Sequence, residues 1–147
     1  GLAVLAIVNI GEEAALPVTA KYIKYKVGAE YLNSIYPLDI KVVANEVGIL
    51  RYFYKTGKII DALGLVTRGA ARHIRARNFS WYLPEHNPEL LFFSLPPRPS
   101  LEGFVKKDWF KRRYKQVKTA WVNGAGELHD QDRGDSIGGF TLYERMD

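Results

Sequence analysis

The sequence contains no cysteine and one methionine among its 147 residues. Without cysteine the chain can form no disulfide, no thiolate zinc site and no thiol nucleophile. The uncharged stretch GLAVLAIVNI at residues 1–10 is shorter than the roughly 20 apolar residues that cross a bilayer. It also lacks the basic start and cleavage site of a signal peptide. Two interpretations of it stay open, a buried first strand or the end of a transmembrane helix.

Several motifs that carry chemistry in enzymes are absent from the chain. There is no G-x-G-x-x-G or G-x-x-x-x-G-K-[ST] phosphate loop, no H-E-x-x-H and no G-x-S-x-G. The three histidines, His73, His86 and His129, are far apart in the sequence and include no i, i+4 pair. We therefore expect no cofactor, no metal site and no catalytic residue within the chain.

The composition is that of an ordinary globular domain. Hydrophobic residues make up 47% and charged residues 25% of the chain, so disorder of the whole chain is not expected. A length of 147 residues suits one domain with a substantial core. We predict a linker or helix end over residues 1–15 and a single α/β domain over residues 16–147.

The formal net charge of +5 favours anionic partners. Much of the excess lies in RGAARHIRAR (68–77) and in KKDWFKRRYK (106–115), where aromatic and basic residues alternate. Such segments suit an anionic membrane surface, a nucleic acid or a solvated face; of these partners we favour the membrane over a nucleic acid. The candidate contact residues are Arg72, Arg75, Arg77, Lys106, Lys107, Lys111, Arg112 and Arg113.

Short apolar runs alternate with helical patterns along most of the chain. Helices are predicted near residues 16–35, 47–54, 67–77 and 108–113, with the buried stripe of the first at Ile23, Val27, Tyr31 and Ile35 and with Thr67 capping the third. Strands are predicted at 41–45, 58–61 and 89–94, followed by a hairpin of 114–122 with 139–145. This alternation predicts a three-layer, Rossmann-like α/β fold with a mostly parallel sheet and a carboxyl-terminal antiparallel hairpin.

Two of the predicted strands are each followed by an acidic residue and a glycine. Glu46 and Gly48 follow the first strand. Asp61 is the last residue of the second strand, and Gly64 follows it. If the strands are parallel neighbours, both carboxylates lie at the carboxyl edge where open α/β sheets bind ligands. The pair could then bind sugar hydroxyls or a metal, or divide acid and base roles, while the glycines allow close approach. Alternatively, Glu46 caps a helix and Asp61 satisfies a turn.

The order of features between about residues 20 and 94 is specific. An amphipathic helix and a proline lead to a strand that closes on Glu-x-Gly, and an aromatic helix then leads to a strand reading Ile-x-Asp-x-x-Gly-Leu. The residues at the key places are Tyr22, Leu32, Pro37, Glu46, Gly48, Tyr52, Asp61, Gly64 and Leu65. With the later PELLFF and GFTLYERM segments, this series resembles the soluble carboxyl-terminal domain of bacterial GT-C-type membrane glycosyltransferases, of the arabinofuranosyl- and mannosyltransferase-like kind. The chain departs from that pattern in Asn45 and in the basic insertion at 68–87.

The resemblance implies an extracytoplasmic, periplasmic-side domain that follows the last transmembrane helix of the same polypeptide. In such proteins the catalytic acid lies outside this domain. We therefore expect a non-catalytic accessory domain of a glycosyltransferase that uses a lipid-linked sugar donor. It would assist binding of a glycan acceptor or cap the membrane-embedded site. A free-standing, methyltransferase-like enzyme in the cytoplasm and a purely structural module stay open as alternatives.

Overall fold

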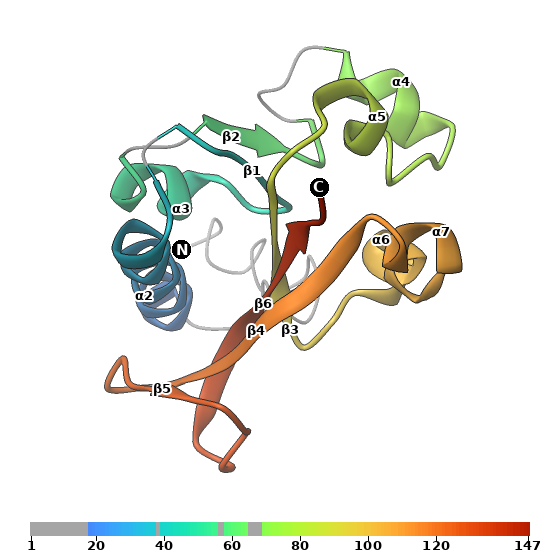
Figure 1. The fold of residues 1–147 in the computed structure, drawn as a ribbon. Helices are drawn as coiled ribbons and strands as arrows, with labels where there is room; N and C mark the ends of the chain where they lie inside the picture. Colours follow the sequence, from blue (N-terminus) through green and yellow to red (C-terminus); the bar gives the residue numbers. More distant parts are fainter. Residues whose placement is uncertain (1–17, 38, 56–57, 65–68) are drawn as a thin grey trace.

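The computed structural model describes residues 18–37, 39–55, 58–64 and 69–147. Within them six strands form one sheet (Figure 1). The strands are β1 (Lys41–Ala44), β2 (Lys58–Asp61), β3 (Leu90–Leu95), β4 (Tyr114–Asn123), β5 (Leu128–His129) and β6 (Ser136–Arg145). The helices are α2 (Val18–Ile35), α3 (Gly48–Phe53), α4 (Ala70–Arg75), α5 (Tyr82–His86), α6 (Pro99–Glu102), the 3₁₀ helix η1 (Gly103–Lys106) and α7 (Asp108–Lys111).

The sheet consists of a parallel half and an antiparallel half. The strand order is β2-β1-β3-β6-β4-β5. Strand β1 pairs in parallel with β2 and with β3. Strand β6 pairs antiparallel with β3 and with β4, and β5 pairs antiparallel with β4. Strand β3 is therefore the junction at which one half meets the other.

The predicted mostly parallel, Rossmann-like sheet is wrong, because the sheet is mixed and most of its pairing is antiparallel. Strands do occur at the predicted places. However, β4 and β6 each have 10 residues, whereas β1 and β2 each have 4. In addition, β6 inserts between β3 and β4. The predicted antiparallel pair of 114–122 with 139–145 is present as β4 with β6. Because β6 also pairs antiparallel with β3, antiparallel pairing reaches the middle of the sheet.

Helices cover both faces of the sheet, and β3 is buried along its whole length. Successive side chains of a strand point to opposite faces. Accordingly, Phe92 packs with α2 and α3 in one cluster, and Phe93 packs in a second cluster with residues of α4, α5 and α7. Across the junction of the two halves, the rings of Phe92 and Phe140 stack with centroids 5.0 Å apart.

Helix α2 packs on the sheet through a different face from the one predicted. The expected stripe is half-buried at Ile23, Val27 and Tyr31 and exposed at Ile35. The most buried positions instead include Tyr25 and Leu32. Gly28 lies on this buried face, where an added Cβ would stand 2.6 Å from Cζ of Phe92. Small residues on this face let α2 approach β3 closely. The helix therefore buries this face against the sheet more deeply than the predicted stripe of larger residues.

Some predictions fall partly or wholly on residues outside the described ranges. These are the linker or helix end at residues 1–15, the buried-strand alternative for the same segment, and the Thr67 cap. The helix predicted at 67–77 is described from Ala70 to Arg75. In the part of the chain that the structure covers, none of the helices combines the length and the apolar character needed to cross a membrane.

Candidate functional site at the carboxyl ends of the parallel strands

Glu46 and Asp61 lie near one another in the strand register but have different partners. Asp61 is the last residue of β2 and pairs with Ala44 of β1, and Glu46 follows Ala44 by two residues. The Asp61 carboxylate is buried and accepts a hydrogen bond from the backbone N–H of Leu63 at 3.0 Å. The Glu46 carboxylate binds Lys21 of α2. A shared cleft between the two carboxylates stays a prediction.

The two glycines near these acids have different surroundings. Gly64 has a φ of +76°, and a Cβ added there would stand 2.2 Å from the Cβ of Ala70. Its role in the structure is therefore to let the backbone at Gly64 lie against Ala70 of α4. Gly48 is exposed at the start of α3, and an added Cβ would meet no atom within 4 Å. A role for either glycine in ligand approach stays a prediction.

Glu46 is the centre of a set of polar side chains from three parts of the fold. Its Oε1 lies 2.7 Å from Nζ of Lys21, and its Oε2 accepts a 3.4 Å hydrogen bond from the hydroxyl of Tyr25. Arg98, in the β3–α6 connection, places Nη2 3.8 Å from the same Oε2. The Glu46 side chain keeps 38% of its surface exposed. These contacts tie α2 and the β3–α6 connection to the end of β1.

A second carboxylate, Glu102, lies beneath the surface beside this set. It is 4% exposed. Its Oε1 accepts a 2.7 Å hydrogen bond from Asn45, and its Oε2 accepts a 3.1 Å hydrogen bond from the backbone N–H of Arg98. Burial raises the pKa of Glu102, while the hydrogen bonds and the nearby Arg98 and Lys24 act in the opposite direction. Asn45, the residue that follows β1, therefore holds this acid.

Lys24 is a buried amine next to both carboxylates. Only 1% of it is exposed. Burial lowers its pKa to about 8, and Glu46 and Glu102 partly oppose that shift. The neighbouring Tyr25 hydroxyl lies 2.9 Å from Oγ of Ser94 on β3. Burial also raises the pKa of Tyr25, so this phenol stays protonated when Lys24 begins to lose its charge.

We call these residues the carboxyl-edge network. They are Lys21, Lys24, Tyr25, Asn45, Glu46, Ser94, Arg98 and Glu102. Only Glu46 among them is a sequence-predicted site residue. Because buried lysine side chains are rare, a lysine in a helical pattern is normally predicted to be exposed. The helical pattern therefore does not predict Lys24 as a buried residue. The signal that was present is the small residues Ala20 and Gly28, four positions either side of Lys24.

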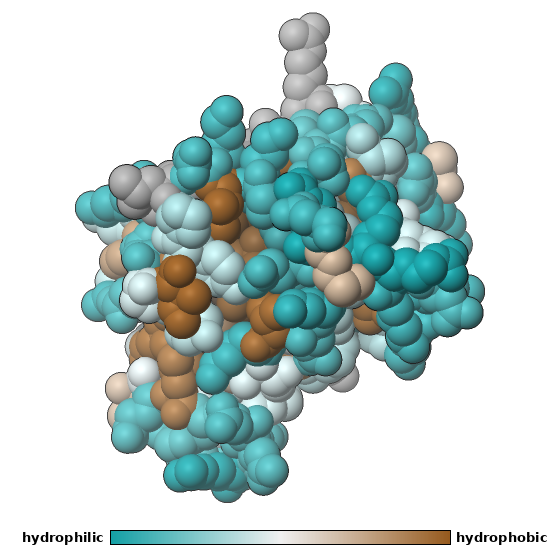
Figure 2. All heavy atoms as spheres, in the orientation of Figure 1, coloured by the Kyte–Doolittle hydropathy of each residue, from teal (hydrophilic) through white to brown (hydrophobic). Residues whose placement is uncertain are grey.

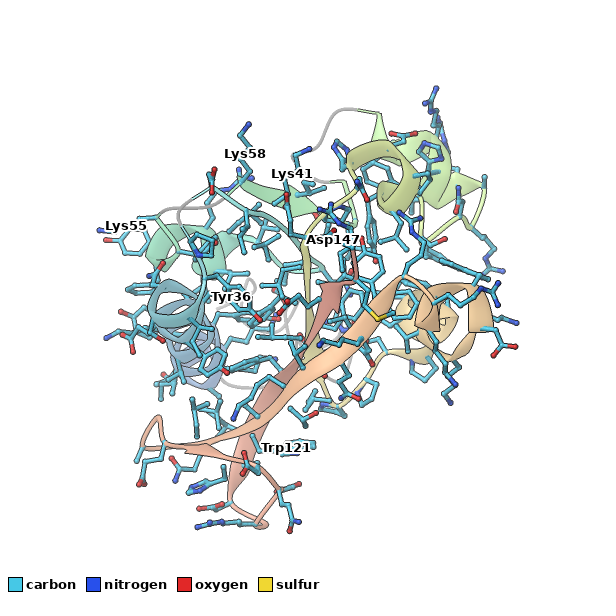
Figure 3. The ribbon with its side chains drawn as sticks, in the orientation of Figure 1. Tyr36, Lys41, Lys55, Lys58, Trp121 and Asp147 are labelled. Atoms are coloured by element: carbon cyan, nitrogen blue, oxygen red, sulfur yellow. The ribbon has the colours of Figure 1, made fainter. Side chains whose placement is uncertain are left out.

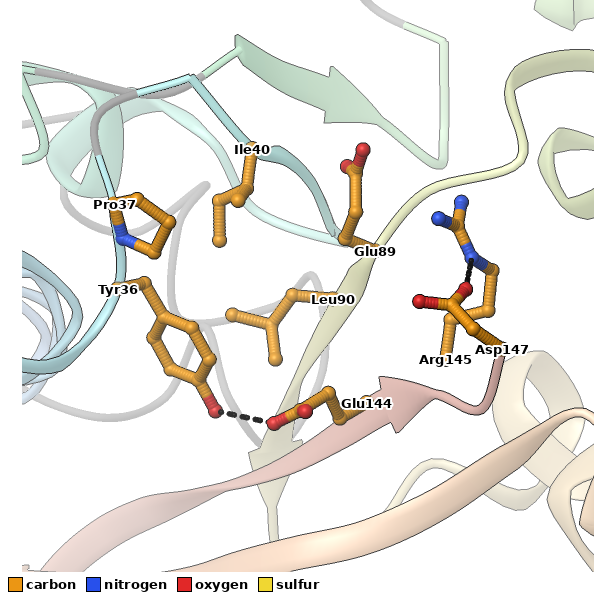
Figure 4. Close-up of a pocket in the computed structure, with 8 residues that line it drawn as sticks. All are labelled: Tyr36, Pro37, Ile40, Glu89, Leu90, Glu144, Arg145 and Asp147. Atoms are coloured by element: carbon orange, nitrogen blue, oxygen red, sulfur yellow. Dashed lines mark hydrogen bonds and ion pairs between the residues drawn. The ribbon is translucent and has the colours of Figure 1, made fainter.

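Two hollows of the surface lie away from the Glu46 and Asp61 side chains. One, of about 210 Å³, opens at the amino ends of β1 and β3, where Tyr36 donates a 3.4 Å hydrogen bond to Glu144 and Arg145 pairs with Asp147 (Figure 4). The other, of about 270 Å³, lies between α2 and the β4–β5 turn. Neither hollow is lined by a residue of the carboxyl-edge network. That network joins three elements at the edge of the sheet where parallel strands place their ligands.

No group of three or more His, Asp or Glu side chains in the described ranges is arranged to hold a metal ion. The basic residues predicted from sequence lie on the helices that follow β2 and β3. Arg72 and Arg75 belong to α4 and Arg77 follows it. The others lie in or next to η1 and α7, and are Lys106, Lys107, Lys111, Arg112 and Arg113.

The comparisons with known proteins assign the chain to one family. Residues 13–142 match a family model described as a domain of unknown function, DUF8728. No curated protein and no solved structure gives a significant match to the chain.

Proposed function

We propose that this chain, which belongs to the DUF8728 family, is a soluble accessory domain of a membrane glycosyltransferase that uses a lipid-linked sugar donor. In this proposal the domain lies on the extracytoplasmic side of the membrane and is joined to the transmembrane part of the same polypeptide. It carries no catalytic residue of its own. Its role is to help bind a polar acceptor or to cap the membrane-embedded active site.

The observation that supports the proposal best is the environment of Glu46. This residue belongs to the Glu-x-Gly feature of the resemblance, and it lies where open sheets bind ligands. Around it stand an ammonium, a guanidinium and a phenol hydroxyl, from Lys21, Arg98 and Tyr25. The side chains of Lys21 and Arg98 are 20% and 26% exposed. Charged donors and a carboxylate acceptor at one partly open place suit sugar hydroxyls and phosphate oxygens.

The other residues that carry the resemblance support a common structural role for that segment. Leu32 is fully buried in the cluster shared by α2, β1 and α3. Tyr22 of α2 meets Phe53 of α3 edge-on, with ring centroids 5.4 Å apart. Helix α2, strand β1 and helix α3 thus pack into one unit, and Glu46 lies in the segment that joins β1 to α3.

The proposal is tested with the complete gene product in its membrane. The gene should encode several apolar segments of about 20 residues before this domain. Sugar transfer from a polyprenyl-phosphate donor is then measured for the wild type and for Glu46→Gln. Loss of a charged hydrogen-bonding group at a binding site should reduce transfer by about tenfold or more.

The matched control is Asp135→Asn, which neutralises an exposed carboxylate in the β5–β6 connection. It should transfer sugar at the wild-type rate. Circular dichroism of the isolated chain establishes that Glu46→Gln still folds. A gene that encodes no membrane-spanning segment, or a folded Glu46→Gln protein with undiminished transfer, would show the proposed function to be wrong.

A further inference from the structure

The two basic segments of the sequence lie on one layer of helices. Helices α4, α5, η1 and α7 contribute to the same buried cluster on one face of the sheet. Tyr82 of α5 meets Phe104 of η1 with ring centroids 6.3 Å apart, and Arg113 donates a 3.2 Å hydrogen bond to Asn87 after α5. Helix α5, which follows α4, thus borders η1 and the end of α7, and both basic segments lie on the side where α4, α5 and α7 stand in Figure 1.

Exposed basic residues outnumber exposed acidic residues in this layer of helices. Among the described residues of 69–89 and 99–113, the exposed acids are Glu85 and Asp108. Glu85 is already engaged by His73 at 2.7 Å and by Arg72 at 3.5 Å. The exposed basic residues, which we call the basic layer, are Arg72, Arg75, Arg77, Lys106, Lys107, Lys111 and Arg112. Hydrophilic side chains dominate the corresponding side of the molecule in Figure 2.

One large aromatic side chain stands among these cations. Trp109 is 39% exposed, and its ring stacks on Phe104 with centroids 6.0 Å apart. The next residue, Phe110, is fully buried and anchors α7 to the sheet. The short helix therefore holds an indole at the surface with Lys107 before it and Lys111 after it. An indole beside lysines is the combination that binds the interface of a bilayer.

We infer that the basic layer, with Trp109, docks on the surface of a membrane that contains anionic lipids. The exposed cations supply long-range attraction to lipid phosphates, and the indole enters the headgroup region. A single-stranded nucleic acid is a poorer match, because it requires several stacking rings along a groove. Of the large hydrophobic side chains exposed in the described residues, Trp109 alone belongs to this layer. The inference rests on charge and exposure and does not require the accessory role proposed above.

The test uses the 147-residue chain and two kinds of vesicle, one of phosphatidylcholine alone and one of equal parts phosphatidylcholine and phosphatidylglycerol. Co-sedimentation should show binding to the anionic vesicles and little to the neutral ones. Binding should fall steeply between about 50 and about 500 mM NaCl, because the screening length shortens from roughly 14 to roughly 4 Å over that range.

A matched pair of triple variants distinguishes the effect of this surface on binding from the effect of net charge. Lys107→Ser/Lys111→Ser/Arg112→Ser should weaken binding to anionic vesicles by about tenfold or more, since each cation near the surface contributes to the attraction. Lys55→Ser/Lys58→Ser/Arg133→Ser removes the same charge from exposed positions elsewhere. Figure 3 shows Lys55 and Lys58 projecting near α3 and β2. This control should bind nearly as the wild type does, and Trp109→Ala should weaken binding several-fold.

Thermal unfolding of each variant establishes that it is folded before its binding is compared. Equal losses in the two triple variants, binding that does not depend on lipid charge, or binding that is insensitive to salt would each overturn the inference. Tighter binding to a single-stranded oligonucleotide than to the anionic vesicles at the same ionic strength would assign the surface to a nucleic acid, and would also overturn it.

Discussion

The parallel and antiparallel halves of the sheet differ in how their strands end. In the parallel half, β2 ends in Asp61, β1 leads into Glu46 and β3 leads into Arg98. Parallel strands bring all their carboxyl ends to one edge, so polar residues placed after different strands meet there. In the antiparallel half, β4 and β6 end at opposite edges of the sheet. The comparison explains why the buried charges gather beside β1 and β3.

The two halves also differ in what stabilises them. The antiparallel half relies on a long, close backbone ladder between β4 and β6. The parallel half has short strands and depends on the helices packed against it and on the carboxyl-edge network. The stacked rings of Phe92 and Phe140 connect the halves. Substitutions of the same kind should therefore have different effects in the two halves, and the following predictions test that difference.

The largest effect is expected for Gly139→Ala in the antiparallel ladder. Gly139 pairs with Trp121, and an added Cβ would lie 2.2 Å from the carbonyl oxygen of Ala120. Because that contact is with backbone, β4 itself must move. The free energy of unfolding, measured by urea denaturation, should fall by about 3 kcal/mol or more. A variant as stable as the wild type would show that the ladder is less rigid than its register indicates.

A second prediction concerns the buried charge in the parallel half. Burial lowers the pKa of Lys24 to about 8 in the folded chain, from 10.5 for an exposed lysine. Between these values the unfolded chain binds more protons than the folded chain, so stability rises with pH. The free energy of unfolding should increase by about 1 to 2 kcal/mol from about pH 7 to about pH 9.5.

The matched variant for this prediction is Lys24→Met, which should lack that rise because it has no titrating amine. Urea denaturation at intervals across the pH range gives both curves. The gain should end above about pH 10, where exposed tyrosines of the unfolded chain ionise while burial keeps the pKa of Tyr82 higher in the folded chain. Parallel curves for wild type and variant up to pH 9.5 would contradict the prediction.

The strand positions could be predicted from the sequence, and so could the parallel pairing of β1 with β2 and the antiparallel pairing of β4 with β6. The place of β6 beside β3 could not. Short apolar, β-branched or aromatic runs such as those of β1 and β3 are bounded by polar and proline residues and indicate strands directly. The insertion of β6 between β3 and β4 depends on contacts between residues far apart in the chain, for example Phe92 with Phe140. Periodicity within a segment carries no information about such contacts, and the prediction of a mostly parallel sheet failed for that reason.

Of the residues in the carboxyl-edge network, only Glu46 could be predicted from the sequence. Glu46 stands out because it follows a strand and precedes a glycine. Lys24 and Glu102 carry charges that patterns assign to the solvent, yet both are buried. Their burial depends on opposite charges and hydrogen-bonding groups brought from β1, α2 and the β3–α6 connection. Such mutual compensation exists only in the folded chain.

A third prediction measures the ion pair between α2 and the end of β1. A double-mutant cycle with Lys21→Met and Glu46→Gln should give a coupling free energy of about 0.5 to 1 kcal/mol, the range for a partly exposed pair. The two side chains are 20% and 38% exposed, and their charged atoms are 2.7 Å apart. Urea denaturation of the four proteins provides the cycle. A coupling of zero would mean that the pair contributes nothing measurable to stability.

The only substitution expected to raise stability is Gly48→Ala in the parallel half, and its effect is small. Gly48 begins α3, and an added Cβ would meet no atom within 4 Å. Alanine restricts the unfolded chain and favours the helix, so the free energy of unfolding should rise by about 0.5 to 1 kcal/mol. The control is Gly69→Ala, where the space is equally open but φ is +85°; it should lose about 1 kcal/mol. If the Gly48 backbone instead closely approaches a bound acceptor, Gly48→Ala should raise the melting temperature of the isolated chain and still lower sugar transfer by the complete membrane protein.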